Sequence, residues 1–341
     1  MVNTIKFWFI KHTRFEFWPY WFAYIPVYFY YIYLSIKAKS FTFFTTANPG
    51  IYLGGFVGES KKNILKKINP TYLPATIYCK NEFNVSKIVD LLAAEQMQFP
   101  LIAKPDVGER GSQVEKITNK QELEKYVHSI GEDFIIQSFI DYEIELGIMY
   151  YHYPNGTLSG INSIVLKEYL SIVGNGVDTI ETLIKNHLRA QGRLAYLLNK
   201  FSYCSEQILP ANEKMLLEPI GNHIRGTKFI NANHLINAKL IAVFDKIAKP
   251  IDGFYIGRFD LKVKSINDLY EGKNIQIMEL NGVSSEPAHI YDPSTFILSA
   301  YKALFQHYKL IFIIAKQNIA LGENYLPFRL VWKQIRMHLS K

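Results

Sequence analysis

The stretch that most constrains this chain runs from residue 254 to 289 and reads FYIGRFDLKVKSINDLYEGKNIQIMELNGVSSEPAH. It contains two patterns of apolar residues separated by a polar, Gly-containing segment, which predicts two strands joined by a turn. Arg258 and Asp260 fall inside the first pattern, and Glu279 and Asn281 inside the second. Because side chains alternate along a strand, each pair shares one face of its strand. If the strands pair, the four polar side chains converge.

Carboxylates inside apolar strands need a partner, because burying one alone costs several kcal/mol. Asp260, Glu279 and Asn281 offer only oxygen ligands, without His or Cys, which favours Mg²⁺. The alternative is a surface hairpin with an Arg258–Asp260 ion pair and a solvated Glu279.

RFD followed by MELNGVSSEP resembles the signature of the ATP-grasp superfamily, in particular ligases similar to D-alanine-D-alanine ligase and cyanophycin synthetase. The resemblance implies an α/β (α+β) fold with a lid subdomain and a larger catalytic subdomain. It implies that Asp260, Glu279 and Asn281 hold two Mg²⁺ ions, for which Mn²⁺ can substitute, across the ATP phosphates. Arg258 would face the acyl-phosphate and the tetrahedral intermediate.

A lysine and a Gly-rich loop follow the apolar strand pattern at 101–103. Lys104 supplies a point charge for a phosphate, and glycines let backbone N–H groups approach phosphate oxygens. The loop residues are Gly108, Gly111 and Ser112. Taken alone this loop is an ordinary hairpin turn, but it matches the ATP-grasp lid loop in place and spacing.

The resemblance also implies the remaining ligand contacts. For the nucleotide they are Lys61, beside Lys62, on a phosphate; Gln137, Phe139 and Ile140 on adenine; and Glu145 on the ribose, with Glu143 as the competing choice. For the substrate they are His223 and Arg225 in the GNHIRG loop, and Ser284 and Ser285 after the second strand. Lys167 could face the nucleotide, with a surface lysine as the alternative.

Apolar periodicity and capping residues predict the main helices. They cover residues 60–68, 85–96, 121–130, a Thr179-capped segment, 235–249 and 295–319. Either Glu59 or Ser60 can cap the first. The predicted organisation is an aromatic-rich N-terminal segment at 1–58, a lid at 59–140, a catalytic subdomain at 141–320 and a basic tail at 321–341. Similar ligases place a Rossmann-like domain before the first helix, and the residues preceding it here are too few for one.

Residues 19–36 read PYWFAYIPVYFYYIYLSI, which is uncharged and half aromatic. Lys6, Lys11 and Arg14 precede this segment, and Lys37 and Lys39 follow it. Prolines interrupt it, and Tyr and Trp prefer the headgroup region, so we expect it to lie in a membrane interface rather than span a membrane. The alternatives are packing on its own domain or on a second subunit of a homodimer.

The tail at 325–341 is basic, and it predicts an amphipathic helix that lies on an anionic membrane or is simply solvated. It carries Arg329, Lys333, Arg336 and Lys341. The 38 basic and 30 acidic residues of the chain favour anionic partners. Because this charge is expected to be spread along the chain and no recognition motif occurs, nucleic acid is not expected as a partner.

Two cysteines, Cys79 and Cys204, provide neither a zinc spacing nor a disulfide framework, which fits a reducing cytoplasm. We therefore expect a cytoplasmic enzyme, peripheral to the inner face of the membrane. Its expected activity is ATP- and Mg²⁺-dependent joining of a carboxylate to an amine through an acyl-phosphate, on small-molecule or lipid-linked substrates. The alternatives are an ATP-grasp kinase and a non-catalytic nucleotide-binding membrane scaffold.

Overall fold

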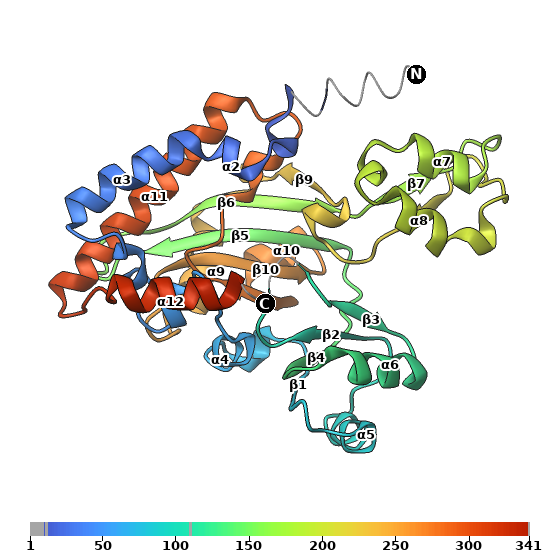
Figure 1. The fold of residues 1–341 in the computed structure, drawn as a ribbon, viewed down its shortest axis with the longest axis horizontal. Coiled ribbons are helices and arrows are strands. Elements are labelled where there is room, and N and C mark those ends of the chain that lie inside the picture. Colours follow the sequence, from blue (N-terminus) through green and yellow to red (C-terminus); the bar gives the residue numbers. More distant parts are fainter. Residues whose placement is uncertain (1–9, 11–12, 109–110, 340–341) are drawn as a thin grey trace.

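The computed structural model describes Ile10, residues 13–108 and residues 111–339. It has the α/β class that the sequence predicts, with antiparallel sheets covered by helices (Figure 1). Lys6, Lys11 and Lys341 lie outside the described residues, as do positions 109–110 of the Gly-rich loop.

The central sheet has five strands in the order β11-β10-β5-β6-β9. They are β5 (Ile144–His152), β6 (Ser159–Glu168), β9 (Lys228–Asn231), β10 (Ile256–Val263) and β11 (Ile275–Asn281). α9 (Ala238–Ala248) packs on one face through Leu240 and Phe244, which meet Phe259 and Leu261 of β10 in one buried cluster. Alternation then directs the charged residues of β10 to the opposite face.

The segment between β10 and β11 is not the predicted turn. It forms a short helix, α10 (Ile266–Glu271). The Ser265 side chain caps it by accepting a hydrogen bond from the Asp268 backbone N–H at 3.1 Å, and Gly272 ends it at φ +69°. Buried Leu269 attaches α10 to the central cluster.

A second sheet has four strands in the order β1-β4-β2-β3. They are β1 (Thr76–Cys79), β2 (Leu101–Pro105), β3 (Glu115–Ile117) and β4 (Phe134–Ser138), covered by α5 (Val85–Ala94) and α6 (Lys120–Ile130). Asn84 and Asn119 cap the two helices, and the sheet has its own buried cluster. It falls within the predicted lid, although the predicted domain boundaries stay a prediction.

A third, smaller unit follows β6. It contains β7 (Ser171–Val173), α7 (Ile180–Asn186), α8 (Leu194–Lys200) and β8 (Lys214–Leu216), and Thr179 caps α7 as predicted. Its own buried cluster includes Ile172, Leu197 and Leu217. The chain then returns to β9 through residues 217–227.

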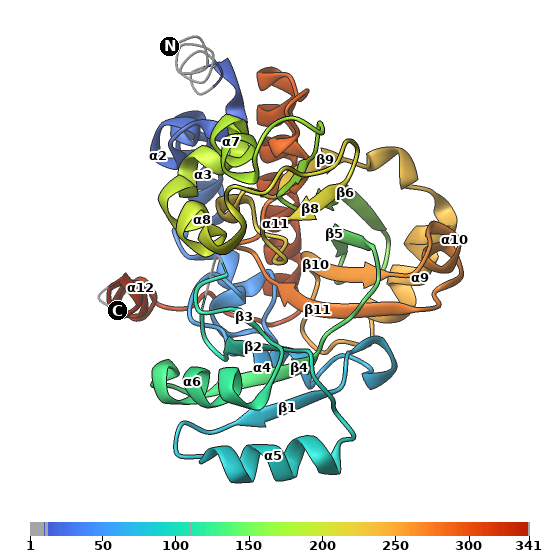
Figure 2. The ribbon, with the colours of Figure 1, turned by 90° about the vertical axis from the view of Figure 1, so that its right-hand side faces the viewer.

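Four further helices form what we call the helical layer. It consists of α2 (Tyr20–Ala23), α3 (Ile25–Ala38), α11 (Ile297–Ala320) and α12 (Phe328–Leu339). α3 packs against α11, and Figure 2 shows α2, α3 and α12 on the side of the molecule away from α9 and α10. Within residues 13–108 and 111–339, none of the helices combines the length and the apolar character that a transmembrane span requires.

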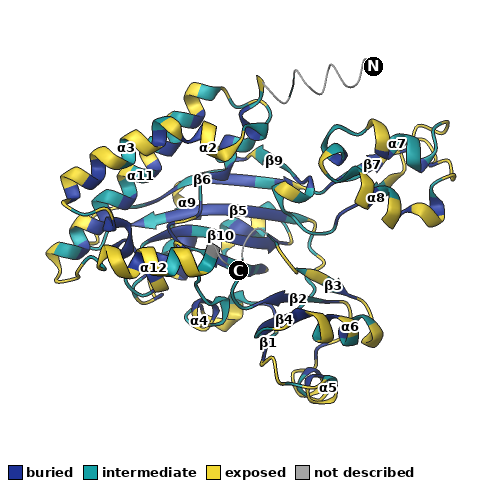
Figure 3. Cartoon of the chain, in the orientation of Figure 1, coloured by how far each residue is buried: buried dark blue, intermediate teal, exposed yellow. Residues whose placement is uncertain are grey.

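The aromatic N-terminal segment therefore has two different faces. Val27 and Leu34 of α3 are buried, whereas Phe29 and Ile36 are about 70% exposed. Figure 3 shows the exposed stretches on the outside of α3 and α12. The alternative of packing on its own domain thus holds for one face only.

Phe244→Ala should lower the free energy of unfolding by about 3–5 kcal/mol, because it leaves a cavity between α9 and the central sheet. Urea unfolding followed by fluorescence measures this. Phe29→Ala, which removes the same group from an exposed position, is the matched control and should change stability little. Equal losses in the two variants would contradict this packing.

Candidate functional site

The four polar side chains of the opening motif converge as predicted. Arg258 pairs with Asn281 and Asp260 with Glu279 in the register of β10 and β11. Arg258 donates from Nε and Nη2 to the two oxygens of Asp260 at 3.0 and 3.1 Å, and Asn281 Nδ2 donates to Asp260 Oδ2 at 3.2 Å. The Arg258–Asp260 ion pair of the alternative is therefore present, but Asp260 is only 6% exposed, so the pair does not lie on the surface, and Glu279 is partly buried.

The oxygen atoms of Asp260, Glu279 and Asn281 suit a Mg²⁺ ion that a bound ligand also coordinates. Burial opposes ionisation of Asp260, but Arg258 and Lys167 outweigh it and hold the pKa of this carboxyl below its usual range. Within the described ranges, no group of three or more His, Cys, Asp or Glu side chains could hold a metal by itself. Two carboxylates and an amide oxygen fit the Mg²⁺ sites in which phosphates and water complete the coordination. Asp260, Glu279 and Asn281 as its ligands stay a prediction.

Lys167 joins Asp260 to a second buried carboxylate. Its Nζ donates to Glu145 Oε1 at 2.9 Å and lies 3.4 Å from Asp260 Oδ1. Although burial opposes its charge, these carboxylates hold the pKa of Lys167 above its usual value. Lys167 is 9% exposed, so the surface alternative for it is wrong.

The Glu145 carboxylate is buried and accepts hydrogen bonds from side chains of the protein, so it is less accessible than an exposed ribose ligand would be. Tyr169 also donates to its carboxylate, and a Cβ added at Gly221 would lie 2.3 Å from its Oε1. The competing Glu143 is exposed. The ribose role of Glu145 stays a prediction.

Two lysines that were not among the predicted site residues lie beside the predicted adenine contacts. Lys262 Nζ donates to the Ile140 carbonyl at 3.0 Å and lies 5.2 Å from the centre of the Phe139 ring. Lys116 Nζ lies 3.9 Å from the same ring. The signal for Lys262 was available, because it continues the alternation of Arg258 and Asp260 along β10. Gln137 is buried, and its side-chain amide donates to Thr76 Oγ1 at 3.2 Å.

Lys104, from β2 of the four-stranded sheet, and Lys61, from the start of the helix that follows Ser60, both contact β11. Lys104 Nζ donates to the Met278 carbonyl at 2.8 Å, and Lys61 Nζ donates to the Gly108 carbonyl and lies 3.8 Å from Glu279. Lys104 is 6% exposed, and burial lowers its pKa to about 8. Among the residues that the structure describes, no carboxylate lies within ion-pair distance of this ammonium.

A short capped helix fixes the position of Lys61. Ser60, rather than Glu59, caps α4 (Lys61–Leu65) by accepting from the Asn63 N–H. The Asp106 carboxylate accepts from the Ser60 hydroxyl at 2.7 Å and from the Lys62 N–H at 2.8 Å. The start of α4 is thereby tied to the end of β2, next to Lys104.

Arg225 reaches the Gly-rich loop from the third unit. Its Nη2 donates to the carbonyls of Gly111 at 2.6 Å and Val114 at 3.3 Å. Gly111 has φ +71°, and a Cβ there would lie 3.2 Å from the Asn222 side chain, so a glycine suits this close approach. The exposed Ser112 follows it.

The other predicted substrate residues differ in their surroundings. His223 points to the N-terminal segment, with Nε2 3.5 Å from Glu16, which also pairs with Arg189. Ser285 is buried and donates to the Gly282 carbonyl, whereas Ser284 is exposed. Their substrate roles stay predictions.

Lys167→Met should destabilise the fold by about 3–5 kcal/mol, because it leaves the buried carboxylates of Glu145 and Asp260 short of a cation. Lys228→Met is the matched control, since Lys228 pairs with Glu168 at 3.1 Å on the surface and should contribute at most about 1 kcal/mol. Urea unfolding compares the two. A Lys167→Met protein as stable as the control would contradict the buried network.

No protein-family model and no curated protein sequence matches the chain. Among solved structures, it is similar to a bifunctional glutathione synthetase from Pasteurella multocida, over 72% of this chain at 13% identity and a TM-score of 0.39. It is similar to a D-Ala:D-Ser ligase from Enterococcus faecalis, over 73% at 14% identity and 0.41. It is also similar to a D-alanine–D-alanine ligase from Bacillus anthracis in complex with ATP, over 77% at 14% identity and 0.40.

The matched parts make up 36%, 61% and 67% of these three proteins. All three likenesses are distant, at 13–14% identity and TM-scores of about 0.4. A likeness this distant assigns neither an activity nor a substrate to it.

Proposed function

We propose that this chain is an ATP- and Mg²⁺-dependent ligase that joins a carboxylate to an amine through an acyl-phosphate. The observation that carries the proposal is Lys104, a buried ammonium whose described partner is a carbonyl rather than a carboxylate. Glu279 and Asp260 attract this ammonium without forming an ion pair with it, and burial still lowers its pKa, so an anionic ligand would stabilise its charge. Lys61 lies close enough to oppose the charge of Lys104, and two neighbouring ammonium groups favour a phosphate chain as that ligand.

The nucleotide would lie between the four-stranded sheet, acting as lid, and the five-stranded sheet, acting as the catalytic body. Gly108 and Gly111 would offer N–H groups to phosphate oxygens, and Lys104 a charge. Phe139, between Lys116 and Lys262, would contact the adenine together with Gln137 and Ile140. The ammonium groups of these two lysines favour an electron-rich aromatic ring, such as adenine, at this position.

Asp260, Glu279 and Asn281 would hold the metal, as two ions that Mn²⁺ can replace. Bound Mg²⁺ neutralises phosphate charge during phosphoryl transfer. Arg258, fixed by its two hydrogen bonds to Asp260, would stabilise the oxyanion when the amine attacks the acyl-phosphate. Arg225 would orient the acceptor from its place at the Gly-rich loop.

A carboxylate or amine carried at a membrane would suit the helical layer. Both cysteines are free and buried, which fits the cytoplasmic location that we propose at the inner face of the membrane. Hydroxylamine tests the reaction class, because it traps an activated acid as a hydroxamate. ATP-dependent formation of a stable phosphorylated product instead would identify a kinase.

Asp260→Asn and Glu279→Gln should each lower ATP turnover at least about a hundredfold, because each removes one ligand charge from the metal site. Glu279 is only partly buried, so Glu279→Gln should leave the fold intact, whereas Asp260→Asn also leaves Arg258 and Lys167 short of an anion and should lower stability. Phosphate release measures turnover, and circular dichroism checks the fold. Glu271→Gln, at an exposed position on α10, is the control with the same charge change and should retain activity. Normal turnover in the first two variants would refute the metal site. A wild-type protein that binds ATP without hydrolysing it would favour the alternative of a non-catalytic scaffold.

Affinity for Mg²⁺-ATP should fall as the pH rises from about 7 to 9, because the Lys104 ammonium, with its pKa of about 8, loses its charge across this window. Calorimetry at each pH measures the affinity. Lys104→Arg keeps its charge and should remove this pH dependence, while Lys104→Ala should bind weakly throughout. A wild-type affinity that is flat across this range would contradict the role of Lys104.

A further inference from the structure

The helical layer carries nearly all of the net positive charge of the chain. Its basic residues are Lys37, Lys302, Lys309, Lys316, Arg329, Lys333 and Arg336, and all seven are exposed. Over the same four helices the sequence has no Asp or Glu. The rest of the chain is left with 31 basic and 30 acidic residues, so it is nearly neutral. Basic residues occur along the whole chain, but the net positive charge is concentrated on the helical layer.

These basic residues follow helical spacing. Lys302, Lys309 and Lys316 are seven residues apart, about two turns, and therefore form one stripe along α11. Arg329 and Lys333 of α12 are four residues apart, on one side of that helix. Such ordered stripes present positive charge to an extended surface rather than to a single small ion.

Large apolar side chains are exposed on the same helices. Half of the exposed large apolar residues of the described chain lie on the helical layer, which holds about a sixth of its length. Trp21 is 67% exposed, Phe29 70% and Trp332 51%. An exposed apolar surface of this kind marks an interaction site.

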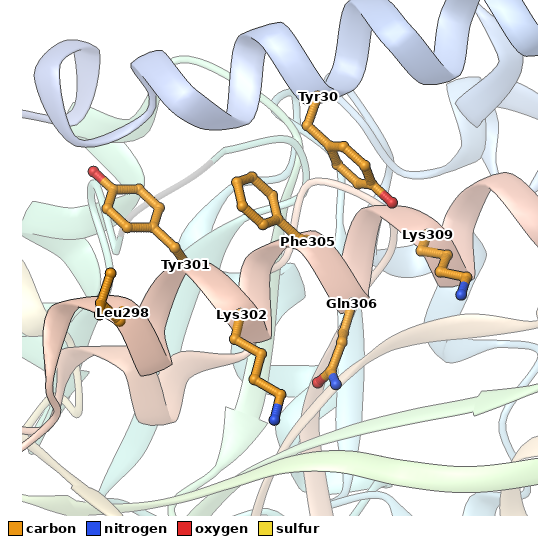
Figure 4. A pocket seen from close by; sticks show the side chains of 7 residues that line it. All are labelled: Tyr30, Leu298, Tyr301, Lys302, Phe305, Gln306 and Lys309. Carbon is orange, nitrogen blue, oxygen red and sulfur yellow. The ribbon is translucent and has the colours of Figure 1, made fainter.

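A groove between α3 and α11 lies within this surface. It has a volume of about 350 Å³, and Tyr30 of α3 and Tyr301 and Phe305 of α11 line it. Figure 4 shows Tyr30 reaching from α3 toward Phe305, with Tyr301 one turn along α11, and Lys302 and Lys309 extending from the same stretch of α11. The aromatic side chains of the groove suit the acyl chain of a lipid, and the two lysine ammonium groups suit its anionic headgroup.

We propose that the helical layer docks on the surface of a bilayer that contains anionic lipids. Trp and Tyr favour the interfacial region, and basic residues are attracted to anionic headgroups. Amphipathic helices combine the two by lying in the plane of the interface. This inference does not depend on ATP binding.

The charge favours lipid over the other occupants of such a surface. A two-fold contact between copies would set the same seven basic residues of each chain against one another, without an acidic residue on the four helices to compensate. Nucleic acid would neutralise the charge but would leave Trp21, Phe29 and Trp332 in water.

The test is sedimentation of the full chain with vesicles of phosphatidylcholine and phosphatidylglycerol, compared with phosphatidylcholine alone. The wild-type protein should bind the mixed vesicles more tightly, and added salt should weaken binding. Combining Lys302→Gln, Lys309→Gln and Lys316→Gln should weaken it by about a hundredfold at low salt, at roughly fivefold per basic residue.

The control triple of Lys120→Gln, Lys125→Gln and Lys239→Gln makes the same charge change at exposed positions outside the helical layer and should bind as the wild type does. An apolar triple of Trp21→Ser, Phe29→Ser and Trp332→Ser should also lose binding without creating a cavity, since all three residues are exposed.

The proposal is overturned if neither vesicle binds the wild-type protein at low salt, or if the control triple loses as much binding as the stripe triple. A dimer in sedimentation velocity that the apolar triple converts to a monomer, without vesicle binding, would identify a second copy as the occupant. Binding to RNA that survives the apolar triple, again without vesicle binding, would identify nucleic acid.

Discussion

The register between β10 and β11 is the constraint on which the candidate site depends. It sets Asp260 directly opposite Glu279 and Arg258 opposite Asn281. A slip by one residue would turn these side chains into the packed face against α9 and bring apolar residues to the site. Phe259 and Leu261, which are fully buried beside Asp260, therefore hold the polar residues in place by the same alternation.

Charge balance links this strand pair to its surroundings. Asp260 is paired with Arg258 and Lys167, and Lys167 is shared with Glu145, so the carboxylates on this face are matched by cations. Lys104 enters from the four-stranded sheet without such a match among the described residues. We propose that this local surplus of positive charge binds the phosphates of the nucleotide. The surrounding ion pairs and hydrogen bonds keep the site ordered before a ligand binds.

Site residues that lie two positions apart on the same strand could be predicted from the sequence. Arg258, Asp260, Glu279 and Asn281 fall on one face because alternation is a local rule. The same alternation places Lys262 on this face, but it does not predict the approach of Lys262 to Phe139, because Lys116 and Lys262 reach that ring from strands of two different sheets. The spacing of residues within one strand does not encode such a contact.

The fold was predictable to a similar extent. The α/β class and most helices follow from periodicity and caps. The pattern predicts a turn where α10 lies, because six residues make less than two helical turns. Ile266, Leu269 and Tyr270 nevertheless have helical spacing, between the Ser265 cap and Gly272. The aromatic N-terminal segment was also ambiguous, because both faces of α3 are apolar. Which face packs is decided by α11, far away in the sequence.

The central claim is that one metal-nucleotide site lies on the charged face of β10 and β11. A crystal of the protein grown with Mn²⁺ and a non-hydrolysable ATP analogue tests it most directly, because Mn²⁺ can be located by its anomalous scattering. The account predicts Mn²⁺ within coordination distance of Asp260, Glu279 and Asn281, with phosphate oxygens on the same ions and near Lys104. A bound analogue whose metal lies away from these three side chains would contradict it.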